Sequence, residues 1–102
     1  MAADDHRITL AEAIAYTHAW QKAHQGERKA WMLPRDIIDE ILKQPGCVGI
    51  RIYAGNTSDD PRLIWVGVRD EKSDMTDGVI AEECWPCPIF CDDESPLLAP
   101  LK

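Results

Sequence analysis

Hydrophobic residues recur at intervals of three and four at the start of the chain, which predicts an amphipathic helix over residues 10–24. Thr9 and Glu12 have the spacing of a capping box, in which the Thr9 hydroxyl accepts from the third helical N–H and Glu12 reaches back. Gly26 is well placed to end the helix. The residues on its expected buried side are Leu10, Ala13, Ile14, Thr17, Trp20 and His24.

A second helix is predicted over residues 35–44, after a short apolar run at residues 30–33 that favours a strand. Pro34 separates the two, because it biases the residue before it away from the helical region and fits the first turn of a helix. Pro45-Gly46 stops the second helix. Its buried stripe consists of Ile37, Ile38, Ile41 and Leu42.

Alternating residues predict strands in the second half of the chain. Residues 47–53 alternate between an apolar face and a more polar one, and residues 62–69 are apolar on both faces, as in the middle of a sheet. Residues 54–61 indicate a loop that is too short for a helical crossover, so we expect the two strands to pair antiparallel. Residues 79–83 predict a third strand.

The composition changes from Cys84 onward, because four of the seven prolines lie at positions 86, 88, 96 and 100. Proline removes ladder donors, so we expect residues 84–102 to be an extended or looped tail rich in proline and cysteine, neither helix nor sheet. The predicted fold class is α+β, with two helices packed on one face of a small, mainly antiparallel sheet of three or four strands. We expect residues 1–102 to form a single domain with a flexible start at residues 1–7.

Composition and charge narrow the function classes. With 45% hydrophobic and 28% charged residues among 102, the chain has the composition of an ordinary soluble globular domain. Eighteen acids against eleven Lys and Arg give a net charge of −7, and residues 51–102 carry 11 of these acids and 5 of these bases. Such a surface repels phosphate groups, which disfavours nucleic acids and anionic membranes as partners. A basic protein partner is allowed, although an acidic surface also serves solubility alone.

The amino-terminal residues are polar and lack the apolar stretch of a secretory signal. No run of about 18 apolar residues could span a membrane. We therefore expect a cytoplasmic protein, in which thiols are normally kept reduced.

Three cysteines, Cys84, Cys87 and Cys91, lie within eight residues, and Cys47 opens the first sheet strand. A C-x2-C pair can supply two of the four tetrahedral ligands of zinc, with Cys91 as the third and Cys47, a His or a carboxylate as the fourth. The second, separated pair of a structural zinc site is missing. The Cys-Trp-Pro-Cys sequence has the form of a dithiol oxidoreductase motif, but too few residues follow it for a thioredoxin-like fold. Two alternatives to the metal site remain: a disulfide, and simple packing of the cysteines as small apolar side chains.

No other motif in the sequence carries chemistry. The phosphate-binding, dinucleotide-binding and serine-nucleophile fingerprints do not occur in it. The sequence therefore favours a small acidic binding or regulatory protein without catalysis and without a cofactor. The alternative is a thiol-redox or zinc-binding protein centred on the cysteine cluster. A homo-oligomer formed through an exposed sheet edge is a third hypothesis.

Several segments form a distinctive set, namely Val48–Gly55, Ile64–Val68, Asp74-Met-Thr-Asp77, Cys87-Pro-Ile-Phe-Cys91 and the Leu33-Pro34 junction. In these segments the chain resembles a family of uncharacterised small bacterial proteins, found mostly in Bacteroidetes, with a C-terminal Cys-Pro-x-x-Cys segment. The resemblance spans residues 8–98 and implies a cytosolic stand-alone domain with no assigned activity. It also implies that Cys87 and Cys91 belong to a shared pattern to which Cys84 and Cys47 need not belong, which weakens a four-cysteine metal site. A Cys87–Cys91 disulfide is the alternative.

Overall fold

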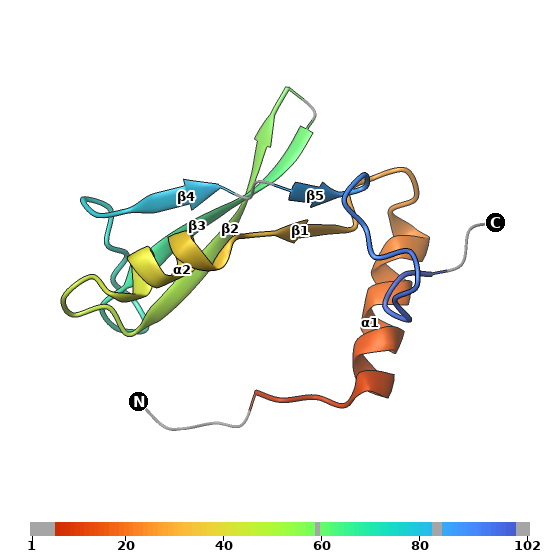
Figure 1. Ribbon diagram of the computed structural model, residues 1–102, viewed down its shortest axis with the longest axis horizontal. Helices are drawn as coiled ribbons and strands as arrows, with labels where there is room; N and C mark the ends of the chain where they lie inside the picture. Colours follow the sequence, from red (N-terminus) through yellow and green to blue (C-terminus); the bar gives the residue numbers. More distant parts are fainter. Residues whose placement is uncertain (1–5, 59, 83–84, 100–102) are drawn as a thin grey trace.

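A computed structural model of the chain describes residues 6–58, 60–82 and 85–99. Within these residues it contains two helices and five strands, and the strands form one antiparallel sheet of two and one of three (Figure 1). The predicted α+β class is confirmed. Neither helix in the described part of the chain is long and apolar enough to cross a membrane.

The first helix, α1, spans Leu10–Ala23 and begins as the sequence predicts. The Glu12 backbone N–H donates to the Thr9 hydroxyl at 3.1 Å, and the Thr9 backbone N–H donates to the Glu12 carboxylate at 2.9 Å. These two bonds complete the capping box and satisfy donors that the first helical turn otherwise leaves unpaired.

The larger sheet has the strand order β2-β3-β4, with β2 at Gly49–Thr57, β3 at Asp60–Val68 and β4 at Ile80–Glu82. The antiparallel neighbours β2 and β3 form a long hairpin in which Ile52 lies opposite Trp65. The loop predicted over residues 54–61 is wrong, because both strands continue through most of that range. Once the apolar residues set the register, pairing the next residues satisfies their backbone groups, and their weak strand propensity does not prevent it.

The second helix, α2, spans Arg35–Leu42 and packs on the side of the larger sheet that carries Gly67. A Cβ atom at Gly67 would lie 3.3 Å from Ile41 Cγ2 and 2.9 Å from Gln44 Nε2, so glycine permits the close approach of α2 to β3. Ile41 is completely buried there. The buried hydrophobic residues among those described are Leu33, Ile41, Val66, Val68, Met75 and Cys87.

The smaller sheet pairs β1, Ala30–Met32, with β5, Trp85–Cys87. The prediction that residues after Cys84 avoid sheet is therefore wrong for β5. Both strands of a two-stranded sheet are edge strands, and an edge tolerates the missing donor of Pro86, which lies opposite Trp31.

The two helices occupy different places. Helix α2 lies against the larger sheet, whereas α1 lies apart from that sheet, beyond the β1–β5 ladder and beside the C-terminal segment (Figure 1). The expected placement of both helices on one face thus holds for α2 and needs correction for α1. The reason is a competing contact, because the buried Gln21 side chain of α1 hydrogen-bonds the backbone of Leu97 and Ala99.

Candidate functional site

The only cysteines that the structure joins, within the described residues, are Cys87 and Cys91, which form a disulfide with a Cα–Cα distance of 4.8 Å. Cys87 is the last residue of β5 and is 2% exposed, whereas Cys91 is half-buried. The bond closes the loop Cys87–Cys91, hereafter the disulfide loop. In a disulfide neither sulfur is a thiolate, so in this state neither cysteine is available to zinc.

The tip of the disulfide loop is apolar and faces solvent. Ile89 is 82% exposed and Phe90 is 55% exposed. The Phe90 backbone N–H donates to the Pro86 carbonyl oxygen at 3.0 Å, which folds the loop back on β5. A short covalently closed turn therefore presents two large apolar side chains that the described chain does not cover.

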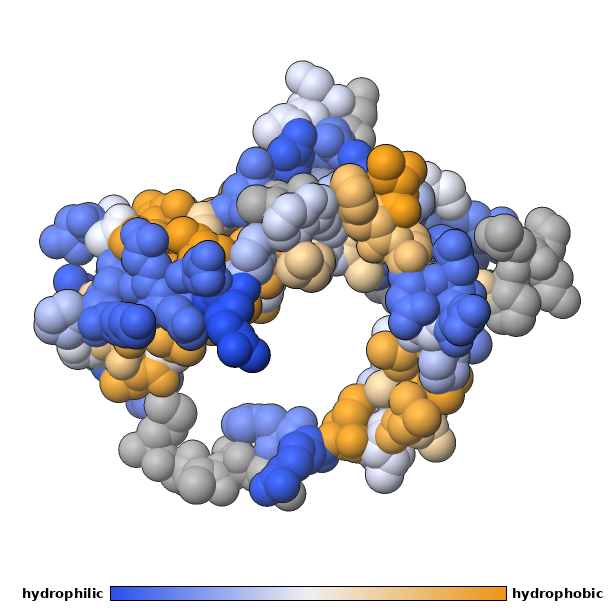
Figure 2. Space-filling model, in the orientation of Figure 1, coloured by the Kyte–Doolittle hydropathy of each residue, from blue (hydrophilic) through white to orange (hydrophobic). Residues whose placement is uncertain are grey.

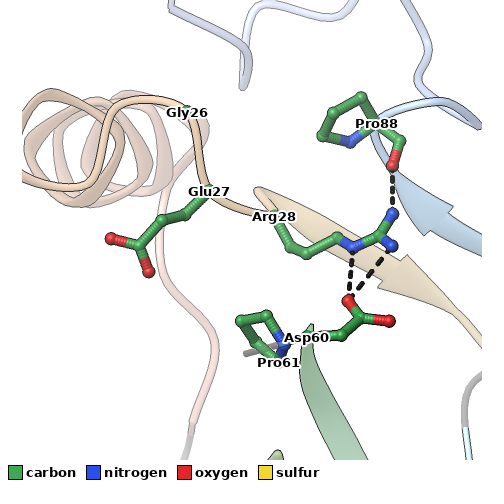
Figure 3. A pocket seen from close by; sticks show the side chains of 6 residues that line it. All are labelled: Gly26, Glu27, Arg28, Asp60, Pro61 and Pro88. Atoms are coloured by element: carbon green, nitrogen blue, oxygen red, sulfur yellow. Dashed lines mark hydrogen bonds and ion pairs between the residues drawn. The ribbon is translucent and has the colours of Figure 1, made fainter. Parts of the chain in front are cut away.

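Arg28 holds the other side of the disulfide loop (Figure 3). Its guanidinium donates to the Pro88 carbonyl oxygen at 2.6 Å and pairs with the Asp60 carboxylate at 3.1 Å. The backbone N–H of Lys29, the next residue, donates to the Cys87 carbonyl oxygen at 2.5 Å. The segment between α1 and β1, the start of β3 and the disulfide loop thus meet at one guanidinium.

Asp60 is the acidic centre of this network. Its second carboxylate oxygen accepts from Arg62 at 3.0 Å, and Arg62 also pairs with Glu82 at 3.1 Å. Partial burial acts to raise the pKa of Asp60, but the hydrogen bond from Arg28 and the charges of Arg28 and Arg62 outweigh it and hold the pKa below its usual 3.8. Asp60 is therefore ionised at neutral pH and neutralises the arginines beside it.

A pocket of about 470 Å³ opens beside the Arg28–Asp60 pair (Figure 3). The Glu27 carboxylate points away from that pair. Because the guanidinium is already bound to a carboxylate and a carbonyl oxygen, it has little capacity left for an anionic ligand. The residues that line the pocket are Gly26, Glu27, Arg28, Asp60, Pro61 and Pro88.

Three consecutive acids, Asp92, Asp93 and Glu94, follow the disulfide loop directly and are exposed. The Glu94 backbone N–H donates to the Asp92 carboxylate at 3.1 Å, and the Ser95 backbone N–H donates to the Asp92 carbonyl oxygen at 3.0 Å, so this segment forms a turn. The apolar tip is thereby placed next to a dense negative charge.

Of the candidate zinc ligands in the described residues, Cys87 and Cys91 lie together and Cys47 lies apart from them. Cys84 lies outside the described residues, and Cys47 lies beside Gly67 under α2, where its thiol donates to the Gly49 carbonyl oxygen at 3.2 Å. No three His, Cys, Asp or Glu side chains in the described residues are grouped as a metal site requires. The zinc hypothesis at Cys84, Cys87 and Cys91 stays a prediction, because one of its ligands is not described.

Sequence reasoning missed Arg28 and Asp60. Neither stands in a motif, and 32 residues separate them, so the sequence carries no signal that would have paired them. Comparison with known families, with curated proteins and with solved structures finds no match to this chain.

Proposed function

We propose that this chain is a small acidic binding protein without catalysis, which docks on a protein partner through the disulfide loop. The observation that carries the proposal is the exposure of Ile89 and Phe90, 82% and 55%, at the tip of a covalently closed turn. Large apolar side chains that stand out from a surface and fill a partner's pocket are the usual energetic centres of protein interfaces.

The surroundings of the tip indicate the chemistry of the partner. Asp92, Asp93 and Glu94 would lie at the rim of such an interface. Acidic rims favour encounter with a basic surface and accelerate association at low salt. The partner is therefore a protein with an apolar pocket bordered by lysine and arginine.

The loop is well suited to binding because it is ordered before contact. The disulfide, the Arg28 bond to Pro88 and the Phe90 bond to Pro86 each restrict its backbone. Restricting a loop in its bound conformation lowers the entropic penalty of association. The same tip on an open, flexible segment would bind more weakly.

The test compares capture of host proteins by the wild-type chain and by Phe90→Asp, with Ile80→Asp as the control. Ile80 is 54% exposed, similar to Phe90, but lies on β4, away from the disulfide loop. The proposal expects a basic protein whose capture is lost with Phe90→Asp, is kept with Ile80→Asp and weakens as salt rises. Capture that is equally strong with wild type and with Phe90→Asp would contradict the proposal.

A second candidate function is thiol–disulfide chemistry, with zinc binding by the reduced thiols as its variant. The proximity of Cys87 and Cys91 favours it, and the half-buried Cys91 sulfur is the more accessible one. Intact mass under native conditions separates the cases, as a mass two units below the fully reduced value indicates one disulfide and a metal adduct indicates a site. Zinc retained after reduction and dialysis would support the variant, and its absence would remove it.

A further inference from the structure

We propose that two copies of this chain form a dimer in which α1 of each copy covers the larger sheet of the other. Two apolar surfaces are left largely exposed by the residues that the structure describes. The first, the helix surface, consists of Leu10, Tyr16 and Trp20. The second, the sheet surface, consists of Leu42, Val48 and Ile52.

The helix surface belongs to a helix that packs little. Leu10 is 60% exposed, Tyr16 is 61% exposed and Trp20 is 40% exposed. The C-terminal segment, residues 96–99, contacts α1 at His18 and Gln21. The side chains of these two residues hydrogen-bond the backbone of Pro96, Leu97 and Ala99. Trp20 stacks on His24 with ring centroids 4.2 Å apart, which leaves the other face of its indole available to a partner.

The sheet surface lies on the α2 side of the larger sheet. Ile50 is opposite Gly67, which faces α2, and side chains alternate along a strand, so Val48 and Ile52 share that face. Val48 is 55% exposed, Ile52 is 48% exposed and Leu42, at the end of α2, is 45% exposed. Helix α2 therefore covers only part of the face.

A second copy of the chain could cover both surfaces at once. A helix with an uncovered apolar stripe and a sheet with an uncovered apolar face are complementary kinds of surface, yet the β1–β5 ladder holds them apart within one chain, with open space between them in Figure 2. In a two-fold dimer, α1 of each copy would cover the sheet surface of the other copy, as exchanged elements do in domain-swapped dimers.

The solvent-accessible area of the chain leaves room for an interface with a second copy. The chain exposes 7712 Å², whereas a compact monomer of 11.5 kDa exposes about 5,800 Å². The surplus of about 1,900 Å² is larger than the roughly 800 Å² that each partner buries in a standard interface. Self-association through these surfaces would remove part of this surplus.

Charge also permits self-association here, although each copy carries −7. Residues 8–24 contain one acid and one Lys, and residues 47–57 contain Arg51 as their one charged residue. Arg51 is already paired with Asp74 at 2.5 Å. Helix α2, which carries Leu42, and the following Lys43 add three acids and two bases, a net charge of −1. The acidic clusters at residues 70–71 and 92–94 lie outside both surfaces, so two copies can approach through them with limited like-charge repulsion.

The first test measures the mass in solution by light scattering and sedimentation, for the wild type and for charged variants. We expect twice the monomer mass of 11.5 kDa. Trp20→Asp and Ile52→Asp should each weaken dimerisation by about thirtyfold or more, the effect of losing a central interface side chain. Ile80→Asp, on the opposite face of the same sheet, should leave the dimer intact. A wild-type monomer at high concentration, or a dimer that survives Trp20→Asp, overturns the proposal.

The second test identifies the contact and needs no destabilising variant. A photocrosslinker replaces the side chain at position 20, and isotope-labelled chains are mixed with unlabelled ones so that crosslinks between copies are recognised by mass. The proposal expects crosslinks between copies that join position 20 to residues 42–54. Crosslinks to α1 of the other copy, or only within one chain, overturn it. Phe90→Asp should leave this dimer unchanged, so failure of the dimer and failure of the binding role are separable.

Discussion

The side chain of Gln21 in α1 holds the backbone of Leu97, because its Nε2 donates to the Leu97 carbonyl oxygen at 3.0 Å. Its Oε1 accepts from the Ala99 backbone N–H at 2.8 Å, so one amide pairs with the C-terminal segment as a neighbouring strand would. Gln21 is 6% exposed and is the buried polar residue among those described. This pairing joins α1 to the C-terminal end of the described chain.

Gln21→Ala should detach the C-terminal segment from α1. Loss of two partly buried hydrogen bonds should lower the free energy of unfolding by about 1–2 kcal/mol. The direct measurement is hydrogen exchange at the Ala99 amide, which should lose its protection. Gln25→Ala, an exposed glutamine just after the same helix, is the control and should change neither quantity. An Ala99 amide that stays protected in Gln21→Ala would show that the pairing does not hold the segment.

Gly67→Ala should loosen the packing of α2 on the larger sheet. The added Cβ would lie 2.9 Å from Gln44 Nε2 and 3.3 Å from Ile41 Cγ2, so helix or side chain must shift. Overpacking of this kind lowers the free energy of unfolding by about 1–3 kcal/mol, measurable by urea denaturation. The matched control is Gly55→Ala in the same hairpin, where the nearest atom would be Ile64 Cγ1 at an ordinary 3.5 Å. Equal effects of the two substitutions would contradict this account of α2.

Asp60→Asn should destabilise the chain at neutral pH and much less in acid. The pKa of Asp60 is lowered in the folded state, so its charged form stabilises the fold above the usual value of 3.8, and this contribution is lost as the pH falls through the lowered pKa. The difference in melting temperature between wild type and variant should therefore shrink as the pH falls below 3.8.

Asp77→Asn is the control for that series. Asp77 has a side chain that is 86% exposed and pairs with Arg69 at 3.4 Å, and exposed pairs of this kind contribute little. Its melting temperature should follow the wild type at every pH. A wild-type advantage over Asp60→Asn that is independent of pH would mean that the carboxylate charge is not what stabilises the Arg28 network.

Cys91→Ser should open the disulfide loop and lower the free energy of unfolding by about 2 kcal/mol, the entropic value for a loop this short. Adding a reductant to the wild type should bring its urea transition to that of Cys91→Ser and should leave the variant unchanged. Capture of the partner proposed above should weaken in parallel, because Ile89 and Phe90 would then sit on a flexible segment. If reductant leaves the urea transition of the wild type unchanged, the disulfide does not constrain the loop.

The sequence was sufficient wherever structure depends on residues a few positions apart. The Thr9–Glu12 capping box, the short second helix after Pro34 and the antiparallel pairing of the two strands follow from local spacing. The register that places Ile52 opposite Trp65 does not. The end of the hairpin was harder, because residues 54–57 have weak strand propensity and gain their pairing only from the register that earlier residues set.

The amino-acid sequence by itself determined the α+β class and the extents of the helices to within two residues. It also determined that the chain is acidic and lacks the common catalytic and nucleotide-binding motifs. Tertiary structure decided the partners: β5 with β1, Arg28 with Pro88 across 60 residues, and Gln21 with Leu97 across 76. Periodicity reports which side of an element is apolar but not which of several surfaces covers it. That choice depends on competing contacts between segments far apart in the chain, and here α1 hydrogen-bonds residues 96–99 and lies apart from the larger sheet.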